Sequence, residues 1–211
     1  MQIIAMLSML IDHIGIIFFP GDVSWRIIGR AAFPIYAYFI VQGYFRTRDV
    51  NRYLRRLVIL AVLSQVPFML GLSTLKINVI GTLAVCLAVL ILADRHPRWA
   101  VGFGVAAAFA LEALPFDYGY YAIALICIYR YLDRRYWMLA HLALNALAYA
   151  LDSDWLLQTF SIFPTLFLAY RDTLFAEIKL GLSSPPRWLW RSFYPAHLAA
   201  LAAVAVWLDN A

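Results

Sequence analysis

Long apolar runs dominate this chain and constrain its fold more than any other feature. Hydrophobic residues fill 64% of the 211 positions, against roughly 45–50% in a soluble globular domain. No regular alternation of apolar and polar residues runs through them. A membrane β-barrel needs that alternation, whereas helices satisfy their own backbone polar groups in lipid. The sequence therefore predicts an all-α fold, a polytopic integral membrane helix bundle.

We expect about nine transmembrane helices, with ends placed to within about 2–4 residues. They lie at approximately 3–20, 27–45, 54–72, 77–93, 99–115, 118–132, 136–151, 155–170 and 192–208. Because no long segment lies between them, we expect one transmembrane domain over residues 1–211. In the longest connection, residues 174–179 have the pattern of an interfacial helix.

The basic residues favour one side of this bundle. Of the 17 Lys and Arg residues, 14 fall on alternate connections on one side, and only Arg26, Arg30 and Lys76 fall on the other. Lys and Arg favour the cytoplasmic side of a membrane. The amino terminus is therefore predicted to be cytoplasmic and the carboxyl terminus external. The same distribution indicates a lipid bilayer as partner and argues against nucleic acid.

Asp12 and His13 form an ionisable pair inside the first apolar span. Such groups are costly in a membrane and mark functional sites. His13 lies about ten residues from the start, or ~15 Å at 1.5 Å per residue, which is near mid-bilayer. Adjacent residues point roughly 100° apart around a helix. We therefore expect each side chain to find its partners on other helices.

The later spans contain a proline, further polar residues and two cysteines. Pro34 should kink the second span, since proline removes a backbone hydrogen bond. His141 and Asn145 share a helical face, and we interpret them as polar links between helices. Cys86 and Cys127 show no metal-type spacing, so no metal is expected.

A neutral histidine in a dry pocket can accept a proton from an attacking amine or hydroxyl and return it to the leaving group. A neighbouring arginine or amide can stabilise the oxyanion of acyl transfer. The basic run from Arg46 to Arg56 can grip lipid head groups, dock nucleotide phosphates, or do both.

Several ordered motifs resemble the TraX family, which is associated with N-acetylation of F-type pilin. They are Met9–Gly15 around Asp12-His13, Gly29–Ile35, Gly43-Tyr44 with Arg46–Arg48, and Ser64–Phe68. Asp117–Gly119 and Tyr194–His197 are similar to later motifs of that family. Through it, the chain looks related to a wider group of transmembrane acyltransferases, which use a histidine late in the first core helix; His13 is the matching position.

The resemblance implies a multi-pass acetyltransferase-like domain of the bacterial inner membrane. Acetyl-CoA would enter from the cytoplasm, and the acceptor, an amine resembling a pilin amino terminus, would be at the outer side of the membrane. His13 would be the general base or carry the acetyl group, and Asp12 would orient or balance neighbouring groups. The remaining assignments are Arg30, Asn78, Asp117 and Tyr118 on the acceptor side, and Gln42, Tyr44, Arg46, Arg55 and His197 at the CoA entrance.

Other interpretations stay open at this point. The acceptor can be a protein or a glycan, so O-acetylation of a sugar or envelope glycan is an alternative, and a homo-oligomer is compatible with the sequence. Asp12, His13 and Glu112 would relay protons in a proton-coupled transporter. In a structural partner of a secretion or pilus assembly, the same polar groups would specify packing only.

Overall fold

The computed structural model describes residues 1–173 and 185–209, and no β-strand occurs in these ranges. The predicted all-α class is confirmed. The predicted interfacial helix at 174–179 lies outside the described residues. In chain order the elements are α1 (Gln2–Phe18), α2 (Val23–Gly29), α3 (Ala32–Arg46), α4 (Val50–Leu72), α5 (Val79–Arg95), η1 (Pro97–Trp99), α6 (Ala100–Ala113), α7 (Gly119–Tyr131), η2 (Arg134–Tyr136), α8 (Trp137–Leu151), η3 (Ser153–Ser161), α9 (Ile162–Tyr170) and α10 (Arg187–Asp209).

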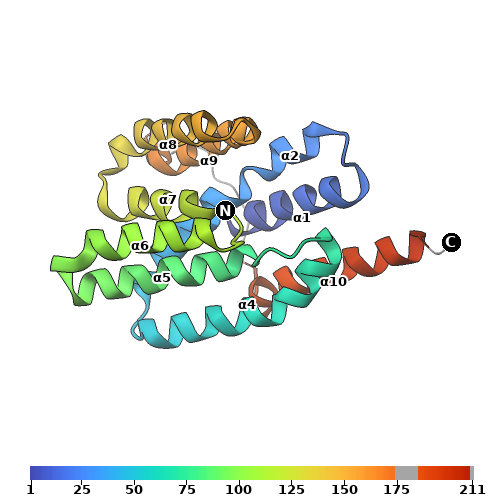
Figure 1. Ribbon diagram of the computed structural model, residues 1–211, viewed down its shortest axis with the longest axis horizontal. Coiled ribbons are helices and arrows are strands. Elements are labelled where there is room, and N and C mark those ends of the chain that lie inside the picture. The colour runs from blue at the N-terminus through green and yellow to red at the C-terminus, as the bar shows by residue number, and fades with distance from the viewer. Residues whose placement is uncertain (174–184, 210–211) are drawn as a thin grey trace.

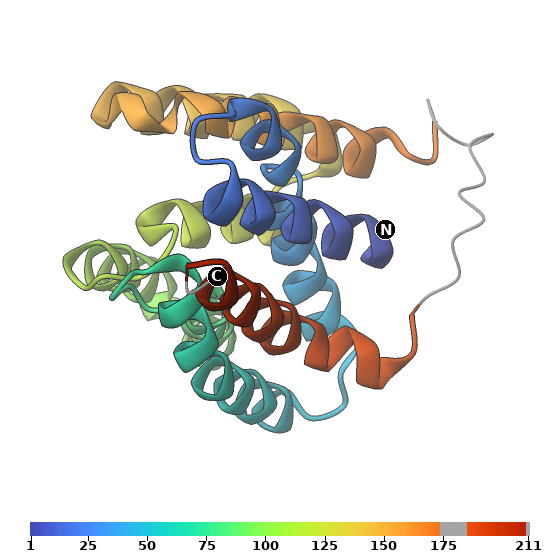
Figure 2. The same cartoon turned by 90° about the vertical axis from the view of Figure 1, so that its right-hand side faces the viewer.

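The helices form a bundle in which neighbours in the chain usually pack together. In Figure 1, α8 and α9 lie along one side, α4 and α10 along the opposite side, and α1, α5, α6 and α7 between them. The view in Figure 2 shows α1 between α2 and α10, and α1 contacts both helices. This placement brings the first and last helices of the chain together.

Two of the predicted spans are each built from two helical pieces. The second is divided at Arg30-Ala31 into α2 and α3, and the eighth is divided into η3 and α9. Pro34 and Pro164 are the third residues of α3 and α9. The first turn of a helix needs no internal N–H donor, so proline is tolerated there. The expected kink at Pro34 is thus a break just before it.

Side-chain caps fix several helix starts. Asn78 caps α5 by accepting hydrogen bonds from the backbone N–H groups of Ile80 and Gly81. Asp49 caps α4 in the same way through Arg52. Asp22 caps α2, and the hydrogen bond from the Ser24 backbone lowers the pKa of its carboxyl. Such caps satisfy donors that have no partner inside the helix.

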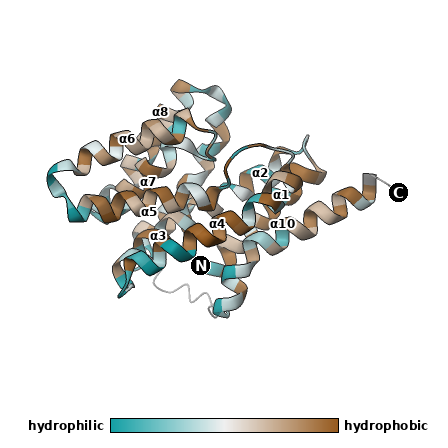
Figure 3. Ribbon diagram, turned by 60° about the horizontal axis from the view of Figure 1, so that its bottom comes forward, coloured by the Kyte–Doolittle hydropathy of each residue, from teal (hydrophilic) through white to brown (hydrophobic). Residues whose placement is uncertain are grey.

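The outer faces of several helices carry large apolar side chains. On α4 Val62 is 68% exposed, and on α6 Val101 and Phe109 are 81% and 76% exposed. Figure 3 shows hydrophobic residues along the helices and hydrophilic residues gathered near several helix ends. Within residues 1–173 and 185–209, α4 alone has the length and hydropathy of a membrane span, while α1 is apolar but shorter. The number of crossings and their orientation stay predictions.

Candidate functional site

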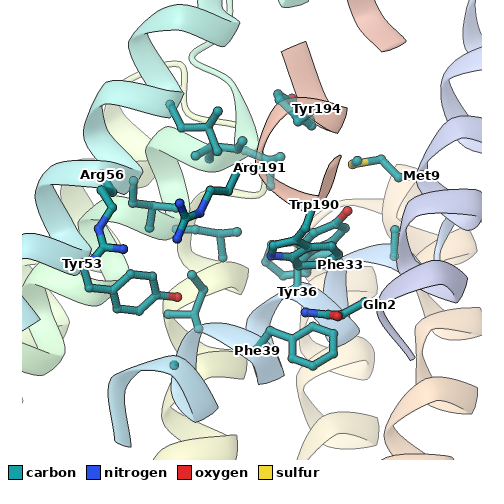
Figure 4. A pocket seen from close by; sticks show the side chains of 18 of the residues that line it. Gln2, Met9, Phe33, Tyr36, Phe39, Tyr53, Arg56, Trp190, Arg191 and Tyr194 are labelled. Atoms are coloured by element: carbon teal, nitrogen blue, oxygen red, sulfur yellow. The ribbon is translucent and has the colours of Figure 1, made fainter. Parts of the chain in front are cut away.

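A cavity of about 820 Å³ opens between α1, α3, α4 and α10. Its walls also include the first residues of α5 and the turn before α7. Figure 4 shows part of the lining, with Phe33, Tyr36 and Phe39 from α3 facing residues of α4 and α10. Ligand sites in proteins usually enclose roughly 300–1,000 Å³. The cavity is therefore large enough for a sizeable ligand.

The cavity runs along α3. Phe33 lines it near the start of this helix and Arg46 at its last residue, so its length is about 20 Å at 1.5 Å per residue. His13, Asp12, Asp117 and Tyr118 line the end near Phe33, which we call the inner end. The end near Arg46 is called the mouth.

His13 is hydrogen-bonded to a histidine from the far end of the chain. Its Nδ1 lies 2.7 Å from Nε2 of His197, and the two rings are nearly coplanar, 7° apart. Nδ1 of His197 lies 2.6 Å from the backbone carbonyl oxygen of Phe193, one turn earlier in α10. Both imidazoles are 7% exposed. No described residue bonds Nε2 of His13, and this ring lines the cavity.

Asp12 is held on the same inner end by two arginines. Its Oδ1 lies 3.3 Å from Nε of Arg26 and 3.2 Å from Nη2 of Arg30. A Cβ atom at Gly29 would clash with the Asp12 carboxylate, so the missing side chain permits the close approach of α2. The expectation that Asp12 and His13 find separate partners on other helices is confirmed.

Arg30 also links the site to a polar network outside the cavity. Its Nη1 donates to Oε1 of Gln158 at 3.1 Å, and Nε2 of Gln158 donates to the Tyr121 hydroxyl at 3.4 Å. Tyr121 in turn bonds His141 and Asn145. Arg30 itself does not line the cavity. It lies behind Asp12 and connects it to the interior of α7, α8 and η3.

The predicted acceptor-side residues divide into two groups. Asp117 and Tyr118 line the inner end, and the Tyr118 ring stacks on Phe33 with centroids 3.9 Å apart. Asn78 is fully buried, caps α5 and donates to Oε1 of Gln65. Asn78 does not line the cavity, so the structure gives it a structural contact instead.

The predicted entrance residues also divide. Gln42 and Arg46 line the cavity, whereas Tyr44, Arg55 and His197 do not. The Tyr44 hydroxyl instead donates to Asp94 on α5 at 2.5 Å, and Arg55 is exposed on α4. Both lie on helix faces turned away from the cavity, because neighbouring positions on a helix point in different directions.

Three further arginines line the mouth, and sequence reasoning missed two of them, Arg187 and Arg191. Arg56 lines it from the second turn of α4, and Arg187 and Arg191 line it from the start of α10. Arg187 and Arg191 had been counted only in the charge distribution, whereas Arg56 ends the basic run that was predicted to dock nucleotide phosphates, grip lipid head groups, or do both. In Figure 4 the side chains of Arg56 and Arg191 lie close to one another beside Tyr53. With Arg46, four guanidinium groups therefore surround this opening.

Aromatic rings form the middle of the cavity. Trp190 from α10 stacks on Tyr36 with centroids 5.2 Å apart and meets the edge of Phe39 at 5.6 Å. All three line the cavity. Among the residues described, no group of three His, Cys, Asp or Glu side chains is arranged to hold a metal ion. The site thus offers cations, aromatic faces and one available imidazole nitrogen.

Comparison with known proteins places this architecture in a family. The family model described as TraX protein matches residues 1–205. The probable fimbrial assembly protein FimC, serogroup H1, of Dichelobacter nodosus is 30% identical over 240 residues, which cover 99% of this chain and 96% of that protein. No solved structure matches the chain. The chain belongs to the TraX family.

Proposed function

We propose that this protein is an integral membrane acetyltransferase. It transfers an acetyl group from cytoplasmic acetyl-CoA to an amine, resembling a pilin amino terminus, at the outer side of the bacterial inner membrane. The observation that carries this proposal is the cavity itself, which joins a mouth of arginines to an imidazole at its inner end.

The mouth suits the donor. CoA carries phosphate groups, and guanidinium groups bind phosphate through paired, charge-assisted hydrogen bonds. Arg46, Arg56, Arg187 and Arg191 are the residues that would hold these groups. The aromatic middle, with Trp190 and Tyr36, suits the elongated and partly apolar arm of the molecule. When bound, acetyl-CoA supplies an acetyl group activated as a thioester.

The inner end suits acyl transfer. The neutral amine would form a bond to the acetyl carbon, and Nε2 of His13 would take the proton that the nitrogen loses. The bond between carbon and sulfur then breaks, and the same proton returns from His13 to the leaving sulfur. Asp12 stays paired with Arg26 and Arg30, so its charge is balanced and it does not compete for this proton.

The surroundings fit a membrane enzyme. Large exposed apolar side chains on α4 and α6 suit contact with lipid, because water-exposed patches of this kind are unusual in monomeric proteins. The cationic mouth then falls on the side that the basic residues assign to the cytoplasm. The relative from D. nodosus bears the name of a fimbrial assembly protein, which supports a pilin-like acceptor.

The transporter alternative has less support. Glu112, its third relay group, accepts a hydrogen bond from the backbone N–H of Tyr120 at 3.4 Å and does not line the cavity. A proton path from His13 through Glu112 therefore has no counterpart in the geometry.

The test uses the purified chain in detergent. CoA should raise its melting temperature, because a ligand that binds only the folded state stabilises it by about 2.7 kcal/mol at a hundredfold excess over Kd. Acetyl-CoA with a peptide carrying a free amino terminus should release thiol and give an acetylated peptide, detected by mass spectrometry. No melting shift at saturating CoA together with no thiol release would overturn the proposal.

A further inference from the structure

The hydrogen bond between His13 and His197 also determines which ring nitrogens carry protons. This inference rests on the acetyltransferase function proposed above. The carbonyl oxygen of Phe193 can only accept hydrogen bonds. Because Nδ1 of His197 lies 2.6 Å from this oxygen, that nitrogen must carry a proton and donate it. In a neutral ring the other nitrogen then has no proton. Nε2 of His197 is therefore an acceptor.

His13 is the donor in the hydrogen bond between the two rings. Its Nδ1 lies 2.7 Å from the accepting Nε2 of His197, so this nitrogen carries the proton and donates. Nε2 of His13 is then left with its lone pair. This is the only nitrogen of the pair without a hydrogen bond to a described residue, and His13 is one of the residues that line the cavity.

The chain of bonds assumes two neutral rings, and the surrounding charges favour them. Arg26 and Arg30 share the carboxylate of Asp12, and no described carboxylate is hydrogen-bonded to either imidazole. A second positive charge beside two guanidinium groups in a buried site would be costly. A positively charged His197 that donates from both nitrogens is therefore disfavoured.

We propose that His197 is a positioning residue that holds His13 in the tautomer whose Nε2 faces the cavity as the base. His197 does not line the cavity and acts through His13. The Phe193 carbonyl orients His197 as a carboxylate or carbonyl orients the supporting histidine of many metal and catalytic sites. Tyr194 and Pro195 lie between these two residues on α10, so the backbone that sets the tautomer is local.

Substitution of His197 separates positioning from packing. His197→Ala should lower kcat about a hundredfold and leave KM for acetyl-CoA within about threefold, in line with the role of general bases. Gln can accept from His13 with its carbonyl oxygen and donate to Phe193 with its amide, so His197→Gln should recover activity to within about tenfold of wild type. His96→Ala, at an exposed turn outside the cavity, is the matched control.

The tautomer of His13 can be measured directly, without an activity assay. The chain has four histidines, and nitrogen NMR of the wild-type protein labelled at histidine, compared with His13→Gln, identifies the His13 signals. We expect a protonated Nδ1 and an unprotonated Nε2, and His197→Ala should give a mixture of tautomers. The opposite tautomer in the wild type would overturn the proposal, as would folded His197→Ala with full activity or no better activity in His197→Gln than in His197→Ala.

These outcomes keep the two proposals apart. If the wild-type protein neither binds CoA nor releases thiol, the acetyltransferase function fails while the NMR result still decides the tautomer. If His197→Ala does not fold, the wild-type tautomer remains the deciding measurement. Wild-type activity with the opposite tautomer refutes only the role of His197.

Discussion

His13 and His141 are both buried histidines in this bundle, and their surroundings differ in one respect. Both nitrogens of His141 are occupied, since Nδ1 lies 2.6 Å from the Thr165 hydroxyl and Nε2 lies 2.6 Å from the Tyr121 hydroxyl. His13 has one bonded nitrogen and one that no described residue bonds, on a ring that lines a cavity. Burial alone therefore does not mark a reactive histidine. An imidazole nitrogen that no described residue bonds, on a residue that lines a cavity, is what makes His13 the candidate base.

The two regions are also connected. Gln158 accepts from Arg30 in the His13 region and donates to Tyr121 in the His141 region. His141 is fully buried and Gln158 is 2% exposed. A polar network rigidifies the helices that carry it to the extent that its members are satisfied; here His141 and Gln158 are bonded at both ends, whereas Nδ2 of Asn145 has no hydrogen-bond partner among the described residues. We therefore interpret the His141 region as the support of α7, α8 and η3 on which the Asp12 and Arg30 pair rests.

The largest expected effect is at His13. His13→Gln should lower turnover by about a thousandfold or more, because it removes the proposed general base, while the melting temperature and CoA binding stay close to those of the wild type. Thiol release and a thermal shift with CoA measure the two quantities. Wild-type turnover in His13→Gln would mean that His13, like His141, has no part in the chemistry.

The next effect concerns the mouth. The double substitution Arg56→Gln and Arg191→Gln should raise KM for acetyl-CoA at least about tenfold with a smaller change in kcat, because hydrogen bonds to charged groups contribute about 1.5–3 kcal/mol each. Arg55→Gln is the matched comparison, since Arg55 is adjacent in sequence but does not line the cavity. An equal rise in KM for Arg55→Gln would mean that the charge run, rather than the cavity, binds the donor.

A smaller effect is expected where the two regions meet. Gln158→Leu leaves Arg30 without one acceptor, so we expect a loss of turnover of several-fold together with a lower melting temperature, as for a buried group left unpaired. Both quantities are measured on the same preparation. A change in stability with unaltered turnover would show that the network does not support the site.

The smallest effect on turnover should come from His141. His141→Leu removes one hydrogen-bond partner from each of Tyr121 and Thr165 and should lower stability by about 1–3 kcal/mol, while turnover per folded molecule stays within about threefold of the wild type. Denaturant or thermal unfolding gives the first value and thiol release the second. A loss of turnover as large as that of His13→Gln would make His141 part of the chemistry.

Much of the fold could be predicted from the sequence. The apolar runs predicted all-α architecture, and the ends of α4, α7 and α8 lie within a few residues of the predicted spans. The break before Pro34 was not predicted as such. A proline can either kink a helix that continues through it or lie in the first turn of a new helix. Only the packing decides between these two outcomes.

The candidate site was predictable in its parts. Asp12 and His13 stand out because ionisable groups are rare in apolar spans, and Arg46 and Gln42 were placed at the entrance. His197 was placed there as well, because its depth along the last span and its family-like motif did not reveal that it meets His13. Arg187 and Arg191 were missed because a charge at a helix start has the same pattern whether it faces a cavity or solvent.

What the sequence by itself determined is the class of fold and the identity of its unusual polar residues, because both follow from local composition and periodicity. The tertiary structure alone decided which of these residues meet. His13 and His197 are separated by 184 positions, and only the packing of α1 against α10 brings their nitrogens to 2.7 Å. In the proposed mechanism the basic nitrogen of His13 depends on that contact, because a histidine's free nitrogen is set by the hydrogen bond that its other nitrogen makes.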